Sequence, residues 1–374
     1  MYIGCARNAD DRYNALKLST EIFQEENNDS LSVKKSSISP FNLVSDEDVV
    51  IIADDNNLVI GACFLINRYL FYGELKVKGT FLSSICIAES SRGLGLSKDL
   101  MNEAIVKCEQ RGSIFAILIA RRSADYYYNQ FSFWGLSQYS LMKLNLKKNQ
   151  VVDQSYSISE VTEKSLTLVN DLFISTYSKL YGSFIRDLEY WKYILWATKN
   201  QKFKFSIFKY NGKIVGYAIY KGSEIYEISV ASESLYIDFL NRIGRFNSTS
   251  DFLIHAPASH PLANELQLSD FSMIKRQCSY GGHMVRVLDK SALLKLRQDE
   301  LQKEACELGI NDWYEMCGDH EIVIKNGTLE VRFPCSEHSY EGTCFLMNAD
   351  RLSSSNKTKL GNKLAFNILY FDQI

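Results

Sequence analysis

The stretch Thr80–Cys108, TFLSSICIAESSRGLGLSKDLMNEAIVKC, leads from an apolar run through a glycine-containing turn into a helical pattern. The run Thr80–Ala88 predicts a strand that is buried on much of its surface. Apolar residues from Leu96 to Cys108 recur at three- and four-residue spacing, which predicts a helix that Gly112 ends. In the order strand, turn, helix, the unpaired amides of a helix N-terminus and the glycines before it suit a diphosphate group.

The turn Arg92–Ser97 can be compared with three kinds of phosphate-binding loop. A Walker A loop needs Lys followed by Ser or Thr after its second glycine, and this turn lacks that pair. A dinucleotide fingerprint needs a third Gly or Ala where Lys98 stands, and a carboxylate after the next strand, where the chain has Arg121 and Arg122. An acyl-CoA loop, Arg/Gln-x-x-Gly-x-Gly/Ala, matches with Ser in the last place. The alternative is a surface turn closed by two glycines.

A second motif, Tyr127–Phe133 (YYNQFSF), follows the strand predicted at Ile114–Ala120. Together the two motifs resemble the GCN5-related N-acetyltransferases (GNAT). That family carries an acyl-CoA loop after its fourth strand and an aromatic-Tyr-x-x-Leu-Gly-Phe stretch after its fifth. Here Phe131 stands for the Leu and Ser132 for the Gly. The resemblance covers residues 1–145, with both motifs in the order and at the spacing that the family implies.

The resemblance implies acetyl transfer from acetyl-CoA to an amine without a metal. The fourth and fifth strands of the family splay apart around the pantetheine arm, whose amides would pair with the backbone of the fourth strand. The diphosphate would rest on N–H groups of the turn. The residues implied in cofactor binding are Ile85, Cys86, Ile87, Arg92, Gly93, Leu94, Gly95, Leu96 and Ser97.

Tyr128 matches the family position of the general acid. A phenol with a reference pKa of about 10 is protonated at neutral pH and can donate to a departing thiolate. In a chain with 22 Tyr, an aromatic packing residue is the alternative, and it is the interpretation given to Tyr126 and Tyr127. The fourth strand offers no carboxylate as a base, and Glu89 and Asp125 are interpreted as solvated loop charges.

The middle of the chain echoes its start after a polar stretch, Asn145–Ser159, that is typical of a linker. Asn211-Gly212 predicts a hairpin with a type I′ turn. Two pairs of segments are similar: Leu58–Ala62 with Lys213–Tyr217, and Ser84–Ala88 with Glu227–Ala231. The residues that follow the second pair, Ser232–Leu235, contain no glycine. We therefore expect a second copy of the fold that cannot hold a diphosphate in the same way.

The last part of the chain predicts a third unit that opens with Met284–Asp289. A helix is predicted over Ser291–Leu308, and a hairpin turns at Asn326-Gly327. A short helix at 348–360 and a strand at 364–371 complete the expectation.

This combination resembles the Eis (enhanced intracellular survival) type of N-acetyltransferases. The resemblance implies an α/β fold of mixed sheets with tandem GNAT folds, the second degenerate, and a small sterol-carrier-like α+β domain. The units would span residues 1–145, 146–283 and 284–374. It further implies ring-like hexamers, acceptors such as aminoglycosides or lysine side chains, and the Ile374 carboxylate as the base.

The composition excludes several function classes. Lys plus Arg number 42 and Asp plus Glu number 44, so the net charge of -2 gives no electrostatic signal for nucleic acid or an anionic membrane. No apolar run approaches the roughly 20 residues that span a bilayer. The nine Cys contain no C-x-x-C pair, and the start of the chain has no signal-peptide pattern, which favours a reducing cytoplasm.

The sequence thus favours an acetyl-CoA-dependent N-acetyltransferase acting on a cationic primary amine, such as an aminoglycoside, a polyamine or a lysine side chain. A non-catalytic acyl-CoA-binding or scaffold protein is the alternative. Lipid carriage by the last unit is a third hypothesis.

Overall fold

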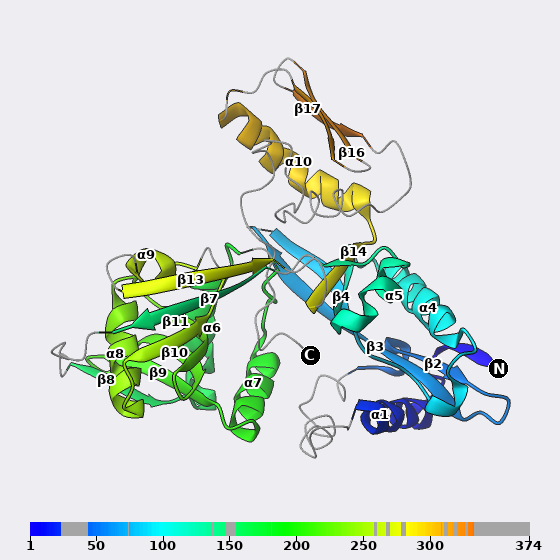
Figure 1. Cartoon of the computed structure of the whole chain (residues 1–374), viewed down its shortest axis with the longest axis horizontal. Coiled ribbons are helices and arrows are strands. Elements are labelled where there is room, and N and C mark those ends of the chain that lie inside the picture. Colours follow the sequence, from blue (N-terminus) through cyan, green and yellow to red (C-terminus); the bar gives the residue numbers. More distant parts are fainter. Residues whose placement is uncertain are drawn as a thin grey trace.

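The computed structural model describes residues 1–23, 44–73, 75–135, 138–146, 155–180, 182–257, 260–266, 270–277, 282–307, 309, 313–317, 320–325 and 328–332. Within these ranges the chain forms two mixed sheets of seven strands each and one sheet of three strands (Figure 1). In that view the first sheet and its helices lie on the right and the second on the left. The expected mixed α/β class is confirmed.

The first sheet lies between helix α1 (Ala9–Phe23) on one face and helix α4 (Leu96–Gln110) on the other. Because side chains alternate along a strand, Ile117 joins the core under α1 and Leu118 joins the core under α4. In order across the sheet, the strands are β1 (Tyr2–Cys5), β2 (Val49–Ala53), β3 (Val59–Tyr72), β4 (Leu75–Ile87), β5 (Phe115–Ala120), β14 (Gly282–Val287) and β6 (Trp134–Gly135).

The strand, turn and helix predicted from the sequence are confirmed in β4 and α4. Gly112 takes φ of +67°, and its N–H donates to the Glu109 carbonyl at 2.9 Å. A residue with positive φ ends the helix as expected, because glycine reaches that region without a steric penalty.

The second sheet contains β13 (Asp270–Gln277), β7 (Gln138–Asn145), β12 (Asp251–His255), β11 (Glu224–Val230), β10 (Lys213–Lys221), β9 (Lys204–Tyr210) and β8 (Tyr156–Glu160). Its helices are α6 (Leu166–Tyr177), α7 (Leu188–Asn200), α8 (Leu235–Asn247) and α9 (Leu262–Leu266). The predicted hairpin is confirmed, since Asn211 and Gly212 both have positive φ, as a type I′ turn requires. The linker was expected to extend to Ser159, but its last residues belong to β8, which pairs with β9 as an edge strand.

The two sheets share a local plan. β4 runs parallel to β5 across α4, and β11 runs parallel to β12 across α8. The Ala88 N–H donates to the Ile60 carbonyl at 2.7 Å, and the Ala231 N–H donates to the Val215 carbonyl at 2.8 Å. These bonds join positions that the aligned segments make equivalent, which supports the predicted internal repeat.

Strand pairing differs from the sequence expectation at two places. Residues 284–289 were expected to open a third unit, but β14 pairs antiparallel with β5 and β6 in the first sheet. β7, expected at the end of the first unit, lies between β12 and β13 in the second. Long-range pairing determines both placements, and no local pattern reveals it. The limits of the three units remain a prediction.

The two sheets are joined through the far end of β3. On the edge away from β4, this end of β3 forms backbone hydrogen bonds with the second unit. The Phe71 N–H donates to the Ser183 carbonyl at 2.8 Å, and the Ile185 N–H donates to the Tyr69 carbonyl at 2.8 Å. The Phe71 and Phe173 rings lie 6.4 Å apart. These contacts tie the hairpin of β3 and β4 to α6.

The last unit contains helix α10 (Lys290–Glu307) and the antiparallel strands β15 (Trp313–Cys317), β16 (His320–Lys325) and β17 (Thr328–Arg332). The predicted helix and hairpin are therefore confirmed. The helix expected at 348–360 and the strand expected at 364–371 lie outside the described residues, so the sterol-carrier-like character remains a prediction. Among the described helices, none has the length and apolarity needed to cross a membrane.

In the second unit, side chains occupy the space beside β11 where its pairing with β12 ends at Ile225. The Tyr177 hydroxyl donates to the Ile228 carbonyl at 3.0 Å, and His260 Nε2 lies 3.0 Å from the same oxygen. His260 Nδ1 accepts from the Leu262 N–H at 3.1 Å, so the hydrogen of the neutral ring lies on Nε2. Burial lowers the pKa of His260 to about 4.

This buried imidazole predicts a loss of stability in acid. His260 binds a proton near pH 6.5 in the unfolded chain and near pH 4 in the folded chain. The free energy of unfolding therefore falls as the pH drops from about 6.5 to about 4. Calorimetric unfolding at pH 7, 5.5 and 4.5 should show the fall, and His260→Gln should reduce it. Burial also lowers the pKa of the half-buried His255, but less than that of His260, so the matched variant His255→Gln should reduce the fall less. An identical pH profile in His260→Gln and the wild type would contradict the prediction.

Candidate functional site

The candidate site lies where β4 and β5 part. They pair in parallel from Gly79 to Leu82 on β4 and from Phe115 to Leu118 on β5, and the pairing then stops. β4 nevertheless continues to Ile87 and remains paired with β3 on its other edge. The last part of β4 therefore has no strand paired on its β5 side, which is the splayed geometry that the sequence resemblance implied.

A bulge in β4 shapes this edge. Between the pairs Ala62–Cys86 and Phe64–Ser83, β3 has one residue and β4 has two. One of the two is Ser84, whose φ of +54° is uncommon for a residue other than glycine. The extra residue breaks the alternation of side chains, so that Ile85 packs with the same core as Leu82. The sequence analysis did not foresee the bulge.

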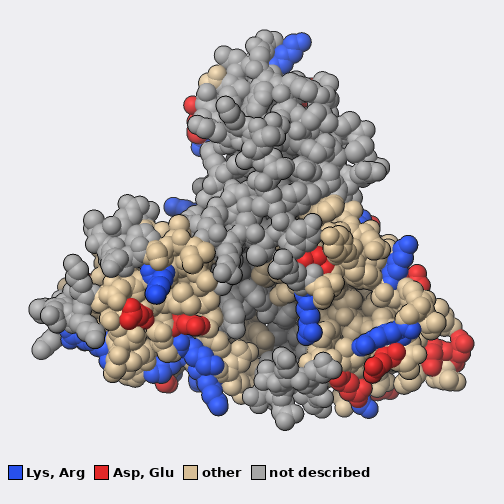
Figure 2. All heavy atoms as spheres, viewed as in Figure 1, with Lys and Arg blue, Asp and Glu red and all other residues tan. Residues whose placement is uncertain are grey.

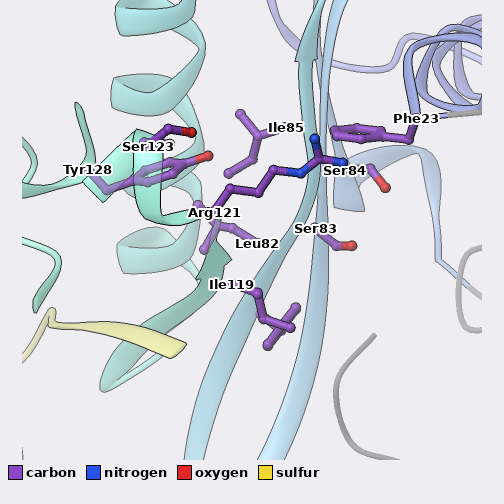
Figure 3. A pocket seen from close by; sticks show the side chains of 11 residues that line it. Phe23, Leu82, Ser83, Ser84, Ile85, Ile119, Arg121, Ser123 and Tyr128 are labelled. Carbon is purple, nitrogen blue, oxygen red and sulfur yellow. The ribbon is translucent and has the colours of Figure 1, made fainter. Parts of the chain in front are cut away.

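A cavity of about 520 Å³ opens between the diverging strands (Figure 3). Its wall combines the end of α1, the bulge of β4, the end of β5 and the start of α5 (Asp125–Asn129). The lining residues are Phe23, Phe81, Leu82, Ser83, Ser84, Ile85, Ile119, Arg121, Ser123, Ala124 and Tyr128.

Tyr128 lies on the cavity wall as part of α5. Its ring packs with the core under α4 and meets the Tyr127 ring edge to face at 5.1 Å. Burial raises the pKa of Tyr128 above that of a free phenol, and the nearby Cys63 and Tyr127 groups raise it further. The hydroxyl is thus protonated throughout the physiological pH range and can act as a proton donor.

The turn at the start of α4 provides a second binding element. Gly93 and Gly95 have φ of +82° and +78°, and a Cβ atom on either would meet no atom within 4 Å. Gly95 is the N-cap of α4, and no side chain caps the helix. The first amides of α4 therefore remain available to an anion, and the helix dipole favours negative charge at this end. These features fit the diphosphate of coenzyme A.

The structure brings only some of the predicted site residues together. Ile85 and Tyr128 share the cavity wall, whereas the turn Arg92–Ser97 does not line it and instead follows the end of β4. The Arg92 Nε–H donates to the Ile87 carbonyl at 3.4 Å, which connects the turn to the strand. Ile374 lies outside the described residues. In the described part of the chain, no group of three or more His, Cys, Asp or Glu side chains could hold a metal ion.

Of the described lining residues, only Ile85 and Tyr128 were predicted from the sequence, and Phe23 and Arg121 are among those that were missed. Phe23 closes one side from the last position of α1, and Arg121 follows the last residue of β5. The signal for Arg121 was its position, since residues at the carboxyl end of a strand beside a gap face whatever fills the gap. In the sequence alone, Arg121 and Arg122 indicated only that no carboxylate follows the strand.

Comparison with known protein families agrees with this geometry. Residues 7–135 match the family model described as an acetyltransferase (GNAT) domain. This range includes β4, the turn, α4, β5 and Tyr128. No curated protein matches the chain. The predicted resemblance to the GNAT acetyltransferases is confirmed for this range.

Solved structures share the fold over most of the chain. A GCN5-related N-acetyltransferase from Anabaena variabilis has 13% identity and a TM-score of 0.62, covering 90% of this chain and 86% of its own. A probable N-acyltransferase of Enterococcus faecalis has 13% identity and a TM-score of 0.63, covering 90% of this chain and 85% of its own. Eis1 of Mycobacterium abscessus has 11% identity and a TM-score of 0.59, covering 89% of this chain and 85% of its own. Identities this low show a common fold, and the narrower Eis type remains a prediction.

Proposed function

We propose that this chain, whose residues 7–135 match an acetyltransferase (GNAT) domain, is an acetyl-CoA-dependent N-acetyltransferase acting on a primary amine in a ternary complex. The observation that carries the proposal is the cavity between β4 and β5, which has a partly buried, protonated phenol on its wall. The uncapped start of α4 follows the same strand. A proton donor on the cavity wall and a diphosphate site in the turn that follows β4 suit an acyl thioester.

The chain would bind the donor mainly through its backbone. Groups of Ser83–Ile87 that lose β5 as a partner would pair with the pantetheine amides. The amides of Arg92–Ser97 and of the first turn of α4 would hold the diphosphate. Bound in this way, acetyl-CoA would supply a thioester carbonyl that an amine can attack. Ser84 holds the bulge that turns the backbone of β4 toward the gap.

Tyr128 would act as the general acid. Its hydroxyl holds a proton at neutral pH because burial raises its pKa. The sulfur of the leaving thiolate would take this proton, and the low-dielectric surroundings strengthen the interaction.

The base must come from beyond the described cavity wall, because that wall contains no Asp, Glu or His. We keep the Ile374 carboxylate as the proposed base. It would accept the proton of the acceptor ammonium, provided that the site lowers the pKa of the amine or relays the proton through water.

The phenol of Tyr128 can be tested directly. Tyr128→Phe should lower kcat by more than about tenfold and leave acetyl-CoA binding in place, because only the donated proton is lost. Thiol release from acetyl-CoA, measured with a panel of amines, gives the rate. Tyr126→Phe, at an exposed ring two residues earlier, is the matched control. An unchanged kcat in Tyr128→Phe would assign the acid to another group, and no thiol release by the wild type with any amine would favour a binding protein.

A comparison of two glycine variants distinguishes loss of the diphosphate site from backbone strain at a positive φ. Gly95→Ala should raise the Kd for coenzyme A by about tenfold or more, because the methyl group enters the space where the diphosphate binds. Gly112→Ala places the same residue at a similar positive φ at the other end of α4, away from the site. Both should lower Tm, and only Gly95→Ala should weaken binding in calorimetry. Equal Kd values for both variants would remove the turn from the binding site.

The proposed base is tested by removing Gln373 and Ile374. The truncated chain should bind acetyl-CoA normally and turn over at least about tenfold more slowly at neutral pH, with part of the rate recovered at higher pH as the amine loses its proton unaided. Steady-state rates across the pH range measure this. Unchanged turnover with intact acetyl-CoA binding would exclude the Ile374 carboxylate from the mechanism.

A further inference from the structure

We propose that the acceptor amine carries a carboxylate, which the Arg121 guanidinium binds on the α1 side of the cavity. The inference rests on the proposed function and names the substrate class of the same site. It differs from the cationic acceptor that the sequence resemblance implied. It follows from the face of the sheet on which Arg121 lies, from the course of its side chain and from the charge of the cavity wall.

The alternation along β5 places Arg121 on the α1 face. Phe115 and Ile117 belong to the core under α1, whereas Ala116, Leu118 and Ala120 belong to the core under α4. Continuing this alternation puts Ile119 and Arg121 on the α1 face. Ile119 is 41% exposed in a strand that is otherwise buried, and it lines the cavity. The cavity therefore has an open side under the end of α1.

The side chain of Arg121 spans this open side. Figure 3 shows it extending across the cavity from the end of β5 toward Ser84 and Phe23, away from Tyr128. Tyr128 and the start of α4 belong to the opposite face of the sheet. The thioester and its diphosphate would therefore approach from the α4 face, and the acceptor would approach from the α1 face, where the guanidinium lies.

The described cavity wall has one charged side chain, that of Arg121. The Arg121 carbonyl accepts from the Ala124 N–H at 2.7 Å, but no hydrogen bond or ion pair joins the Arg121 side chain to another residue in the part of the chain that the structure describes. On the face shown in Figure 2, acidic and basic side chains of the described residues are interspersed, and the net charge of the chain is only -2. Arg121 is exposed on the open side of the cavity, so its guanidinium would select substrates by charge only at this site.

Guanidinium chemistry favours a carboxylate at this position. The planar fork of Arg donates two parallel hydrogen bonds to a carboxylate, with the apolar faces of Phe23 and Ile119 nearby. A polyamine or an aminoglycoside would instead bring positive charge against Arg121. An amino acid or a short peptide meets both demands, because its carboxylate can pair with Arg121 while its amine faces the thioester near Ser84 and Tyr128.

Matched pairs of acceptors test the proposal in the full-length chain. Each amino acid is compared with its own amide, which keeps the amine and the side chain and removes the carboxylate. The amine of the amide has the lower pKa, so amine reactivity alone would favour the amide. With saturating acetyl-CoA, the wild type should show a kcat/KM at least about tenfold higher for the acid, mainly through a lower KM.

Three variants test whether Arg121 causes the preference for the amino acid over its amide. Arg121→Gln should reduce the preference to less than about threefold, and Arg121→Lys should restore part of it, because the charge returns without the fork. Arg245→Gln, at an exposed arginine of α8 in the second unit, should behave as the wild type. Binding of acetyl-CoA to Arg121→Gln, measured by calorimetry, confirms that the variant is folded.

The outcomes separate this inference from the proposed function. Thiol release with polyamines or amides at least as efficient as with amino acids would overturn the inference and leave the acetyltransferase in place. An unchanged preference in Arg121→Gln would overturn the assignment to Arg121. No thiol release by the wild type with any amine would overturn the proposed function, and the inference with it.

Discussion

The end of hydrogen bonding between β4 and β5, after Leu82 and Leu118, is the constraint on which the site depends. A buried backbone group without a partner costs free energy, so a strand that continues past its neighbour must find other partners. The bulge at Ser84 changes which groups of β4 turn toward the gap, and its positive φ is a local strain that the pairing of β3 and β4 on both sides maintains. The result is a strand edge without a paired strand beside the cavity, which suits a ligand that carries amides along its length.

In the second sheet, β11 also continues past the end of its pairing with β12, but side chains fill the space beside it. Tyr177 and His260 supply side-chain partners to the Ile228 backbone, at the position that the aligned segments make equivalent to Ile85. At the position equivalent to Ser84 stands Glu227, which pairs with Arg186, and neither side chain is exposed. Removing one member of such a pair would leave an uncompensated buried charge, so this gap cannot easily be reopened. One repeat thus keeps a cavity and the other converts it into core, which explains why a single donor site is expected.

The sequence allowed prediction of the features that local physics determines. Glycines at positive φ and apolar residues at helical spacing were enough for the start and the end of α4, and Asn211-Gly212 was enough for a hairpin. The position of Tyr128 on the cavity wall also followed from its motif. The bulge did not, because it depends on the register between β3 and β4. The importance of Arg121 depends on the face of β5 from which it projects, and that face is defined only when α1 and α4 have packed on the sheet.

The exchange of strands makes the site a property of the whole chain. β5, one wall of the cavity, has β4 as its neighbour for only part of its length and has β14 along its other edge from Phe115 to Ala120. β14 follows the entire second unit in the sequence, and β7 carries the chain from the first sheet into the second. A fragment that ended after the first 145 residues would leave β5 with an open edge beside the gap, and its strands could close the gap or recruit another chain. The second unit therefore contributes to the cavity, because the strand that follows it in the sequence, β14, pairs with β5.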